Sequence, residues 1–221
     1  MLVWLASYPR SGNSFFRTIL RECFDLRTLS LYGASDDRVF SSPDVRRAIG
    51  HVSTDLAGRE LIDFAHSASE TMIIKTHEGP LTDDRAIHIV RNGQSALISY
   101  MHYIRQVEGV AWPLEKIIRG EVFAGSWSDH YRMWAGRPNT MLLRFEDIVA
   151  DPNATAEKVS EFLSLPIKRR YSTEFNELKK LHPAFFRSGN DAENVRELAA
   201  HKELKELFDS YHSEVMALSG Y

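Results

Sequence analysis

Four short apolar runs constrain the fold of this chain more than any other feature of its sequence. Within each run the hydrophobic residues are continuous or nearly continuous, as expected of strands that helices cover on both faces. Helical patterns separate the runs along the chain. The sequence therefore predicts an α/β fold built around a central parallel sheet. The predicted strands are residues 2–6, 71–74, 86–90 and 140–143.

A positively charged side chain lies at the end of each predicted strand. Arg10 lies in the turn after the first strand, Lys75 and Arg91 follow the second and third, and Arg144 follows the fourth. Ligands of a parallel sheet bind outside the carboxyl ends of its strands, so these four cations are expected to line one cleft. The sequence predicts that this cleft binds a polyanion.

The first of these turns has the sequence SYPRSGNSF, residues 7–15. Gly12 allows a tight turn, and Asn13 or Ser14 is suited to cap a following helix. The N–H groups at a helix start attract an anion, and the planar guanidinium of Arg10 suits phosphate or sulfate oxygens. The turn thus resembles a phosphate loop, although no Gly-Lys-Ser/Thr follows as in nucleoside triphosphatases. For this segment alone, an ordinary polar turn is an equal alternative.

The rest of the chain adds helices and one polar stretch. Beyond about residue 153 the apolar spacing is helical and no strand is evident, with helical patterns at residues 156–165, 173–181 and 193–218. The polar stretch at residues 33–43 is predicted to be a long loop. We expect a parallel sheet followed by a helical C-terminal part.

Composition narrows the class of protein. A chain of 221 residues is expected to form a single domain, residues 1–221. The net charge of −3 argues against nucleic-acid binding driven by bulk charge. The single cysteine, Cys23, excludes an internal disulfide and favours a reducing, cytoplasmic location. The first apolar run is too short for a membrane span, and none is expected. The residues indicate no particular oligomeric state.

Three main segments and two weaker ones resemble segments of a known family. YPRSGNSFF, residues 8–16, is similar to the 5′-phosphosulfate loop of sulfotransferases that use 3′-phosphoadenosine 5′-phosphosulfate (PAPS). In this resemblance Arg10 takes the basic position of the loop, and Phe15 takes the position of an adenine-packing tryptophan. The loop residues that the resemblance assigns to PAPS are Arg10, Ser11, Gly12, Asn13, Ser14 and Phe15.

The second segment, IVRNGQSALISYMHY at residues 89–103, resembles the family's 3′-phosphate segment. There an arginine leaving a strand is followed eight residues later by a serine, as Arg91 is by Ser99. LLRFEDI, residues 142–148, is similar to another family segment and implies that Phe145 lies near adenine. FFRSG, residues 185–189, resembles the loop that closes over the 3′-phosphate and adds Arg187, Ser188 and Gly189 to the implied binding residues.

The third segment, KTHEGP at residues 75–80, resembles the Lys-Thr-His segment of the cytosolic members. The resemblance implies that His77 is the general base and that Lys75 contacts the sulfuryl group. Glu78 is a second candidate base, because some carbohydrate-directed relatives use a carboxylate.

The resemblance implies an enzyme with a P-loop-like three-layer α/β fold. It would move a sulfuryl group from PAPS to an acceptor hydroxyl or amine by in-line displacement, with His77, Lys75 and Arg10 as catalytic residues and no metal. The residues leave the acceptor open among sugars, lipids, phenols and peptides. The region from residue 25 to 69, with Tyr32, Phe40 and Phe64, and residues 103–112 are expected to shape its pocket.

Two other interpretations remain. A P-loop small-molecule kinase should show Gly-Lys-Ser/Thr and a strand-borne carboxylate, and neither is evident. A non-catalytic nucleotide-binding protein would keep the fold without the chemistry, and the presence of Lys75 and His77 argues against it.

Overall fold

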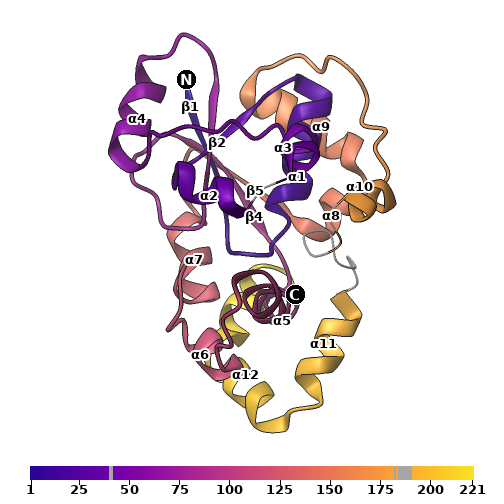
Figure 1. The fold of residues 1–221 in the computed structure, drawn as a ribbon. Coiled ribbons are helices and arrows are strands. Elements are labelled where there is room, and N and C mark those ends of the chain that lie inside the picture. The colour runs from indigo at the N-terminus through magenta and orange to yellow at the C-terminus, as the bar shows by residue number, and fades with distance from the viewer. Residues whose placement is uncertain (40–41, 182, 184–190) are drawn as a thin grey trace.

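The computed structural model describes residues 1–39, 42–181, 183 and 191–221. Within these residues the centre is a five-stranded parallel sheet with the strand order β2-β3-β1-β4-β5 (Figure 1). The four predicted strands are confirmed as β1, β3, β4 and β5. The short β2 is not among them, because three residues are too few to form a pattern. The strands are β1 Leu2–Ser7, β2 Thr28–Ser30, β3 Met72–Thr76, β4 Arg85–Val90 and β5 Thr140–Arg144.

Helices cover both faces of the sheet, which confirms the three-layer α/β fold. Successive side chains of β1 point to opposite faces, and every residue of this strand is buried. Val3 and Leu5 pack in one cluster with apolar residues of α1 and α9. Trp4 packs in another with residues of α4 and with Trp134 of α7. The continuous apolar pattern of the strand follows from this burial on both sides.

A helical part lies beyond the carboxyl ends of the strands, in the lower half of Figure 1. Its core is a cluster of apolar side chains from α5, α6, α7, α11 and α12. The turn after β1 therefore lies between the sheet and this helical part. The helices of this part are α5 Gly93–Tyr103 with its π-helical continuation Ile104–Glu108, α6 Leu114–Arg119, α7 Trp127–Trp134, α11 Asp191–Ala199 and α12 Lys202–Leu218.

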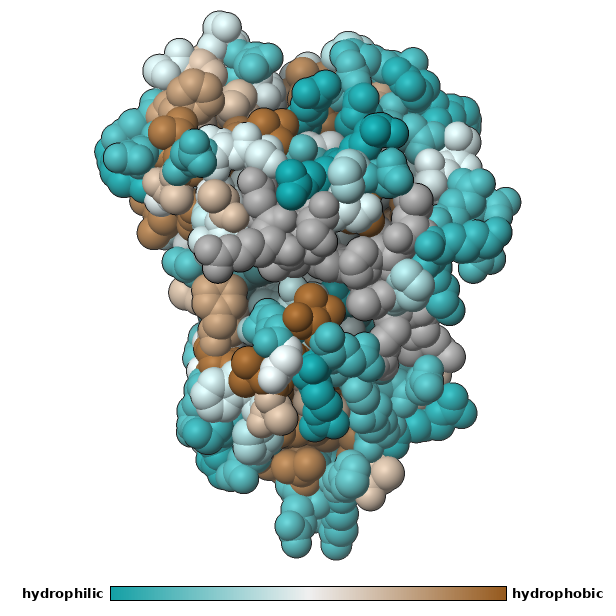
Figure 2. All heavy atoms as spheres, in the orientation of Figure 1, coloured by the Kyte–Doolittle hydropathy of each residue, from teal (hydrophilic) through white to brown (hydrophobic). Residues whose placement is uncertain are grey.

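The helices packed around the sheet are α1 Asn13–Phe24, α2 Ala34–Val39, α3 Pro43–Ala48, α4 Gly58–Ser67, α8 Phe145–Ala150, α9 Pro152–Leu163 and α10 Phe175–Leu181. Among the described helices, none is both long enough and apolar enough to cross a membrane. Over α3 and α10, the face drawn in Figure 2 is largely hydrophilic.

Three local expectations are wrong. The predicted loop at residues 33–43 contains α2 and the start of α3, because a buried ion pair of Asp36 holds this polar segment against the sheet. The N-cap of α1 is Gly12, with no side-chain cap, since the Asn13 amide donates to Ser7 Oγ instead. The apolar pattern at residues 193–218 forms two helices, α11 and α12, rather than one.

Candidate functional site

The turn after β1 bends sharply at two residues with left-handed backbone conformations. Arg10 has φ 65° and Gly12 has φ 99°. A Cβ atom at Gly12 would lie 2.2 Å from Cδ2 of Phe145, so the turn passes directly against that ring. Only glycine combines this backbone with this close approach.

The same turn has the features of an anion site. It leads into the start of α1, where the first N–H groups have no acceptor within the helix. Ser11 is buried, and its hydroxyl has no hydrogen-bond partner among the described residues. A buried hydroxyl of this kind is costly unless a bound group completes its hydrogen bonds.

Arg10, Ser99 and Arg91 come together at this turn, as the sequence resemblance implies. Arg10 Nε donates to Ser99 Oγ at 3.4 Å, and its guanidinium lies 5.0 Å from the centre of the Tyr103 ring. Arg91 Nη1 donates to the backbone oxygen of Arg10 at 2.9 Å. The turn after β1, the residue after β4 and helix α5 therefore meet here, through contacts that link Arg10 to both Arg91 and Ser99.

Arg91 is also held by two groups from distant parts of the chain. Its guanidinium lies 4.6 Å from the centre of the Phe145 ring, the ring that packs on Gly12. Arg91 Nε donates to Asp191 Oδ1 at 2.8 Å, and Nη2 donates to the same oxygen. Sequence reasoning did not anticipate Asp191, because it lies 100 residues from Arg91.

Of the other residues that the resemblance assigned to the nucleotide, one lies at the start of α1, one is buried in the core and three lie outside the described residues. Ser14 is half-buried in the first turn of α1. Phe15 is 5% exposed and meets Tyr171 edge-on, with 6.0 Å between ring centres. In this structure Phe15 is thus part of the core beside α9. Outside the described residues lie Arg187, Ser188 and Gly189.

His77 lies directly after β3, with its ring held from two sides. Nδ1 lies 2.7 Å from the backbone oxygen of Ser7, and the ring stacks on Tyr32 at 6.3 Å between centres. The Tyr32 hydroxyl accepts a hydrogen bond from the backbone N–H of His77 at 2.7 Å. A carbonyl oxygen can only accept, so Nδ1 carries the proton and Nε2 of the neutral ring has the free lone pair.

The electrostatics keep the ring of His77 neutral. The pKa of His77 lies well below its ordinary value, because burial disfavours the imidazolium and the Lys75 ammonium repels it. A histidine in this state is a proton acceptor at neutral pH.

Lys75 is buried in β3 and paired with Asp36 of α2. Its Nζ donates to Asp36 Oδ2 at 2.7 Å and lies 5.0 Å from the centre of the Tyr32 ring. Burial lowers the pKa of Lys75, and the negative charge of Asp36 opposes that change. Burial acts to raise the pKa of Asp36, but the charge and hydrogen bond of Lys75 outweigh it and leave that pKa below its usual value.

Asp36 and Asp191 are the two site residues that sequence reasoning missed. Both are aspartates in polar segments, and each binds a cation that is far away along the chain, over 39 and 100 residues. A cation at the end of a buried strand does signal that a carboxylate is needed. Nothing local says which carboxylate supplies it.

Glu78, the second candidate base, is less enclosed than His77. Its side chain is exposed. Its backbone is held by two hydrogen bonds. The N–H donates to Thr76 Oγ1 at 3.0 Å, and the carbonyl accepts from Trp134 Nε1 at 2.9 Å. The geometry thus orders the main chain of Glu78 rather than its carboxylate.

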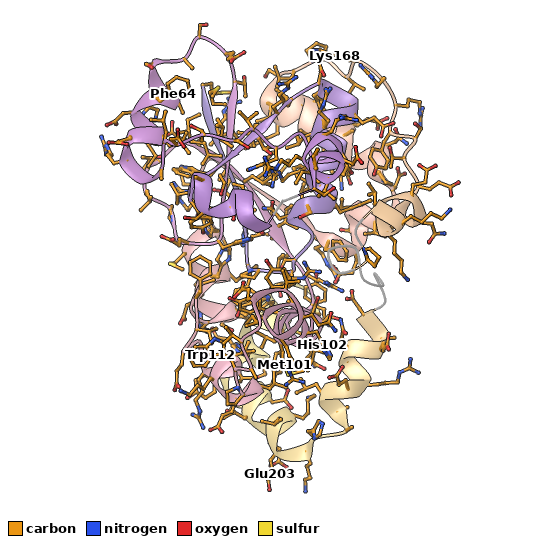
Figure 3. The ribbon with its side chains drawn as sticks, in the orientation of Figure 1. Phe64, Met101, His102, Trp112, Lys168 and Glu203 are labelled. Carbon is orange, nitrogen blue, oxygen red and sulfur yellow. The ribbon has the colours of Figure 1, made fainter. Side chains whose placement is uncertain are left out.

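The residues expected around the acceptor are spread more widely than the sequence suggested. Tyr32 lies at the site and meets Phe123 at 5.6 Å between ring centres. Phe64 is exposed on α4, in the half of the molecule away from Trp112 (Figure 3). Phe40 lies outside the described residues. Tyr32 and Phe123 are therefore better placed than Phe64 to form a wall beside the site.

Comparisons with known proteins bear on this arrangement. Residues 2–214 match the family model described as sulfotransferase domain. Sulfotransferase 1A1 of Bos taurus is 35% identical over 202 aligned residues, which cover 80% of this chain and 65% of that protein. The 3-alpha-hydroxysteroid sulfotransferase of Cavia porcellus is 29% identical over 93 residues, 38% of this chain and 32% of that protein. The chain spans less than two thirds of the length of either relative.

A solved structure has a similar fold. The crystal structure of mouse sulfotransferase SULT7A1 complexed with PAP has a TM-score of 0.70 and 21% identity, and the match covers 96% of this chain and 84% of that one. At this identity the likeness concerns the fold.

Proposed function

Because the chain belongs to the sulfotransferase domain family, we propose that it transfers a sulfuryl group from PAPS to an acceptor hydroxyl or amine. The observation that carries the proposal is the convergence of Arg10, Arg91 and Ser99 on the turn after β1, with His77 held against Ser7 of that strand. PAPS carries a 5′-phosphosulfate and a 3′-phosphate, and this cluster offers cations and hydroxyls for both.

The 5′-phosphosulfate would bind at the turn. Arg10, the buried Ser11 hydroxyl and the N–H groups at the start of α1 are its proposed donors, together with Gly12, Asn13 and Ser14 as loop residues. The complex of the mouse relative with PAP, adenosine 3′,5′-bisphosphate, supports a nucleotide of this kind.

The 3′-phosphate would bind at Arg91 and Ser99. Phe145, held between Gly12 and Arg91, is the proposed neighbour of the adenine ring. Phe15, Arg187, Ser188 and Gly189 stay in the proposal on the resemblance of their segments alone.

His77 would act as the general base. Its Nδ1–H donates to the Ser7 carbonyl, which leaves Nε2 to take the acceptor proton as the acceptor oxygen or nitrogen bonds to sulfur. The bond between sulfur and the bridging phosphate oxygen breaks on the opposite side, and Lys75 would neutralise the charge that develops on that oxygen. The Nδ1–H contact that directs Nε2 of His77 and the exposure of Glu78 favour His77 over Glu78 as the base.

The test is transfer of label from ³⁵S-PAPS to a panel of desulfated glycans, phenols, lipids and peptides. Labelled acceptor together with released PAP would support the proposal and name the acceptor class. Binding of PAP without transfer to any of these acceptors would instead favour a non-catalytic nucleotide-binding protein.

A second arm of the test addresses the kinase alternative. We propose that Arg10, Lys75 and the start of α1 supply the positive field and that no metal takes part. Turnover with PAPS should therefore continue in excess chelator. Magnesium-dependent transfer of phosphate from ATP to an acceptor would establish the kinase instead.

A further inference from the structure

Asp36 is a buried carboxylate in direct contact with the proposed catalytic lysine. The side chains of Lys75 and Asp36 are 6% and 11% exposed, and 2.7 Å separates Nζ from Oδ2. Taking both charges out of water is costly, and such pairs often add nothing to stability. Stability alone is therefore a poor explanation for a carboxylate at this position.

The charges around Lys75 show what the carboxylate does. Arg17 of α1 is buried near it, and its positive charge acts with burial to lower the pKa of Lys75. His77 follows directly after the same strand, and the Tyr32 ring lies over the ammonium. Asp36, which also accepts a hydrogen bond from Ser30, is the group in this cluster that favours the charged lysine.

The contact also orients the ammonium. An ammonium group has three N–H donors, and Asp36 Oδ2 accepts one of them. Among the described residues no other acceptor takes a hydrogen bond from Nζ, so we assign the other two donors to oxygens of a bound sulfuryl donor. A neutral amine in the same place could not offset negative charge on the bridging oxygen.

We propose that Asp36 is a positioning residue for sulfuryl transfer, which holds the Lys75 side chain in place and keeps it protonated in a buried site. This inference rests on the proposed function. It assigns to α2, a helix in a polar segment, a part in the chemistry at the end of β3.

The main experiment is the pH dependence of kcat/KM in Asp36→Asn, with the acceptor found in the ³⁵S-PAPS screen. Asparagine keeps the shape and an acceptor oxygen but loses the charge. The alkaline limb of the profile should move to lower pH, while the rates of variant and wild type converge where Lys75 is protonated in both. Above the limb the loss should approach the roughly 10²–10³-fold cost of removing an electrostatic donor.

A matched control is Asp44→Asn. Asp44 is an exposed aspartate of the nearby helix α3 and pairs at 3.4 Å with Arg47. Its replacement should leave the pH profile unchanged. A general effect of losing a carboxylate in this region would move both profiles alike and would overturn the assignment to Asp36.

A second measurement needs no acceptor. In protein labelled with ¹³C at lysine Cε, the Lys75 resonance can be assigned by its loss in Lys75→Arg and then titrated. Asp36→Asn should make Lys75 titrate at lower pH than in the wild type. If the titration does not move, the proposal is wrong, even if the chain proves to be a sulfotransferase.

Lys75→Arg keeps the inference testable if Asp36→Asn does not fold. An arginine stays charged at all working pH values, so the alkaline limb due to Lys75 should vanish from the rate profile. A limb that persists unchanged would show that protonation of Lys75 does not limit the rate, and the proposal would fail. Absence of transfer by the wild type would instead be a failure of the proposed function, and the role of Asp36 in transfer would fall with it.

Discussion

At the scale of single residues, Arg91 connects three parts of the chain through one guanidinium group. It donates to the backbone of Arg10 and to the carboxylate of Asp191, and it lies over the Phe145 ring. A 3′-phosphate at this position would exchange contacts with Asp191 for stronger ones with a dianion. Recognition of PAP should therefore depend on Arg91.

We expect PAP to raise the thermal stability of the protein much more than AMP does, because AMP lacks the 3′-phosphate. Arg91→Ala should remove that preference, a loss of about 1.5–3 kcal/mol in binding free energy for a charge-assisted hydrogen bond. Thermal-shift titrations with both nucleotides measure it. Arg119→Ala, at a partly exposed guanidinium of α6, is the control and should keep the preference. Equal shifts for PAP and AMP in the wild type would contradict the assignment.

The second prediction at this scale concerns His77. His77→Asn should lower kcat by about 10²–10⁴-fold, the range for a lost general base, and leave the affinity for PAP nearly unchanged. In the wild type the rate should not fall until well below pH 6.5, the ordinary pKa of histidine, because the base form of His77 is lost only at its lowered pKa.

The control is Glu78→Gln at the neighbouring position. Its exposed carboxylate should be replaceable with little loss of turnover. Near-normal turnover of His77→Asn together with an inactive Glu78→Gln would reverse the assignment of the base, without changing the proposed reaction.

At the scale of elements, the turn between β1 and α1 is tightly packed, so its backbone conformation fixes how the strand leads into the helix. Gly12 combines a φ of 99° with the contact to the Phe145 ring, and Phe145 begins α8. The carboxyl end of β5 is thereby pressed against the proposed phosphate loop.

Gly12→Ala should therefore destabilise the protein by about 2–5 kcal/mol, the sum of the left-handed backbone and the overpacking of a methyl group. Gly58→Ala is a matched control, since Gly58 also has a positive φ of 52° but no atom within 4 Å of the added Cβ. It should cost only about 1–2 kcal/mol. Urea unfolding measures both, and equal costs would show that the contact with Phe145 is unimportant.

At the scale of the whole molecule, buried histidines couple stability to pH. His88 of β4 and His130 of α7 are almost fully buried, and His212 of α12 accepts from Ser128 Oγ and donates to the Ile118 carbonyl. Burial lowers the pKa of His130 to about 3 and that of His212 to about 4, and it holds the pKa of His88 well below its ordinary value.

These histidines stay neutral in the folded chain but bind protons near pH 6.5 when it unfolds. As pH falls below about 6.5 the unfolded state binds more protons, so the free energy of unfolding should fall, by about 1.4 kcal/mol per pH unit for each such group. The fall should continue until the folded pKa values near 4 and 3 are reached. Urea unfolding at pH 7.5, 6.0 and 5.0 tests this.

His130→Gln should reduce that pH dependence by one proton, whereas His201→Gln, at an exposed position, should leave it unchanged. Constant stability between pH 7.5 and 5.0 would refute the prediction.

We also propose that residues 1–221 form a single domain, because α5 contributes to the site at the end of the sheet. The same curves should then show one cooperative transition.

Much of the fold and part of the site could be predicted from local patterns. The apolar runs of β1, β3, β4 and β5 predict buried strands, and a parallel sheet brings their carboxyl ends together. Arg10, Arg91 and Ser99 could be grouped on that basis, and the structure does bring them into contact. The short β2, the helix at residues 34–39 and the break between α11 and α12 could not be predicted, because their local signals are weak or misleading.

The sequence by itself determined which residues follow each predicted strand at the carboxyl edge of the sheet. It also showed that a cationic side chain lies at or near each of these strand ends. The tertiary structure alone decided which partners those cations have. Asp36 and Asp191 reach Lys75 and Arg91 across 39 and 100 residues, and Ser7 selects the tautomer of His77 across 70. The reason is physical: strand and turn preferences act between near neighbours, whereas a buried charge is satisfied by whichever group the packed chain brings within hydrogen-bond distance.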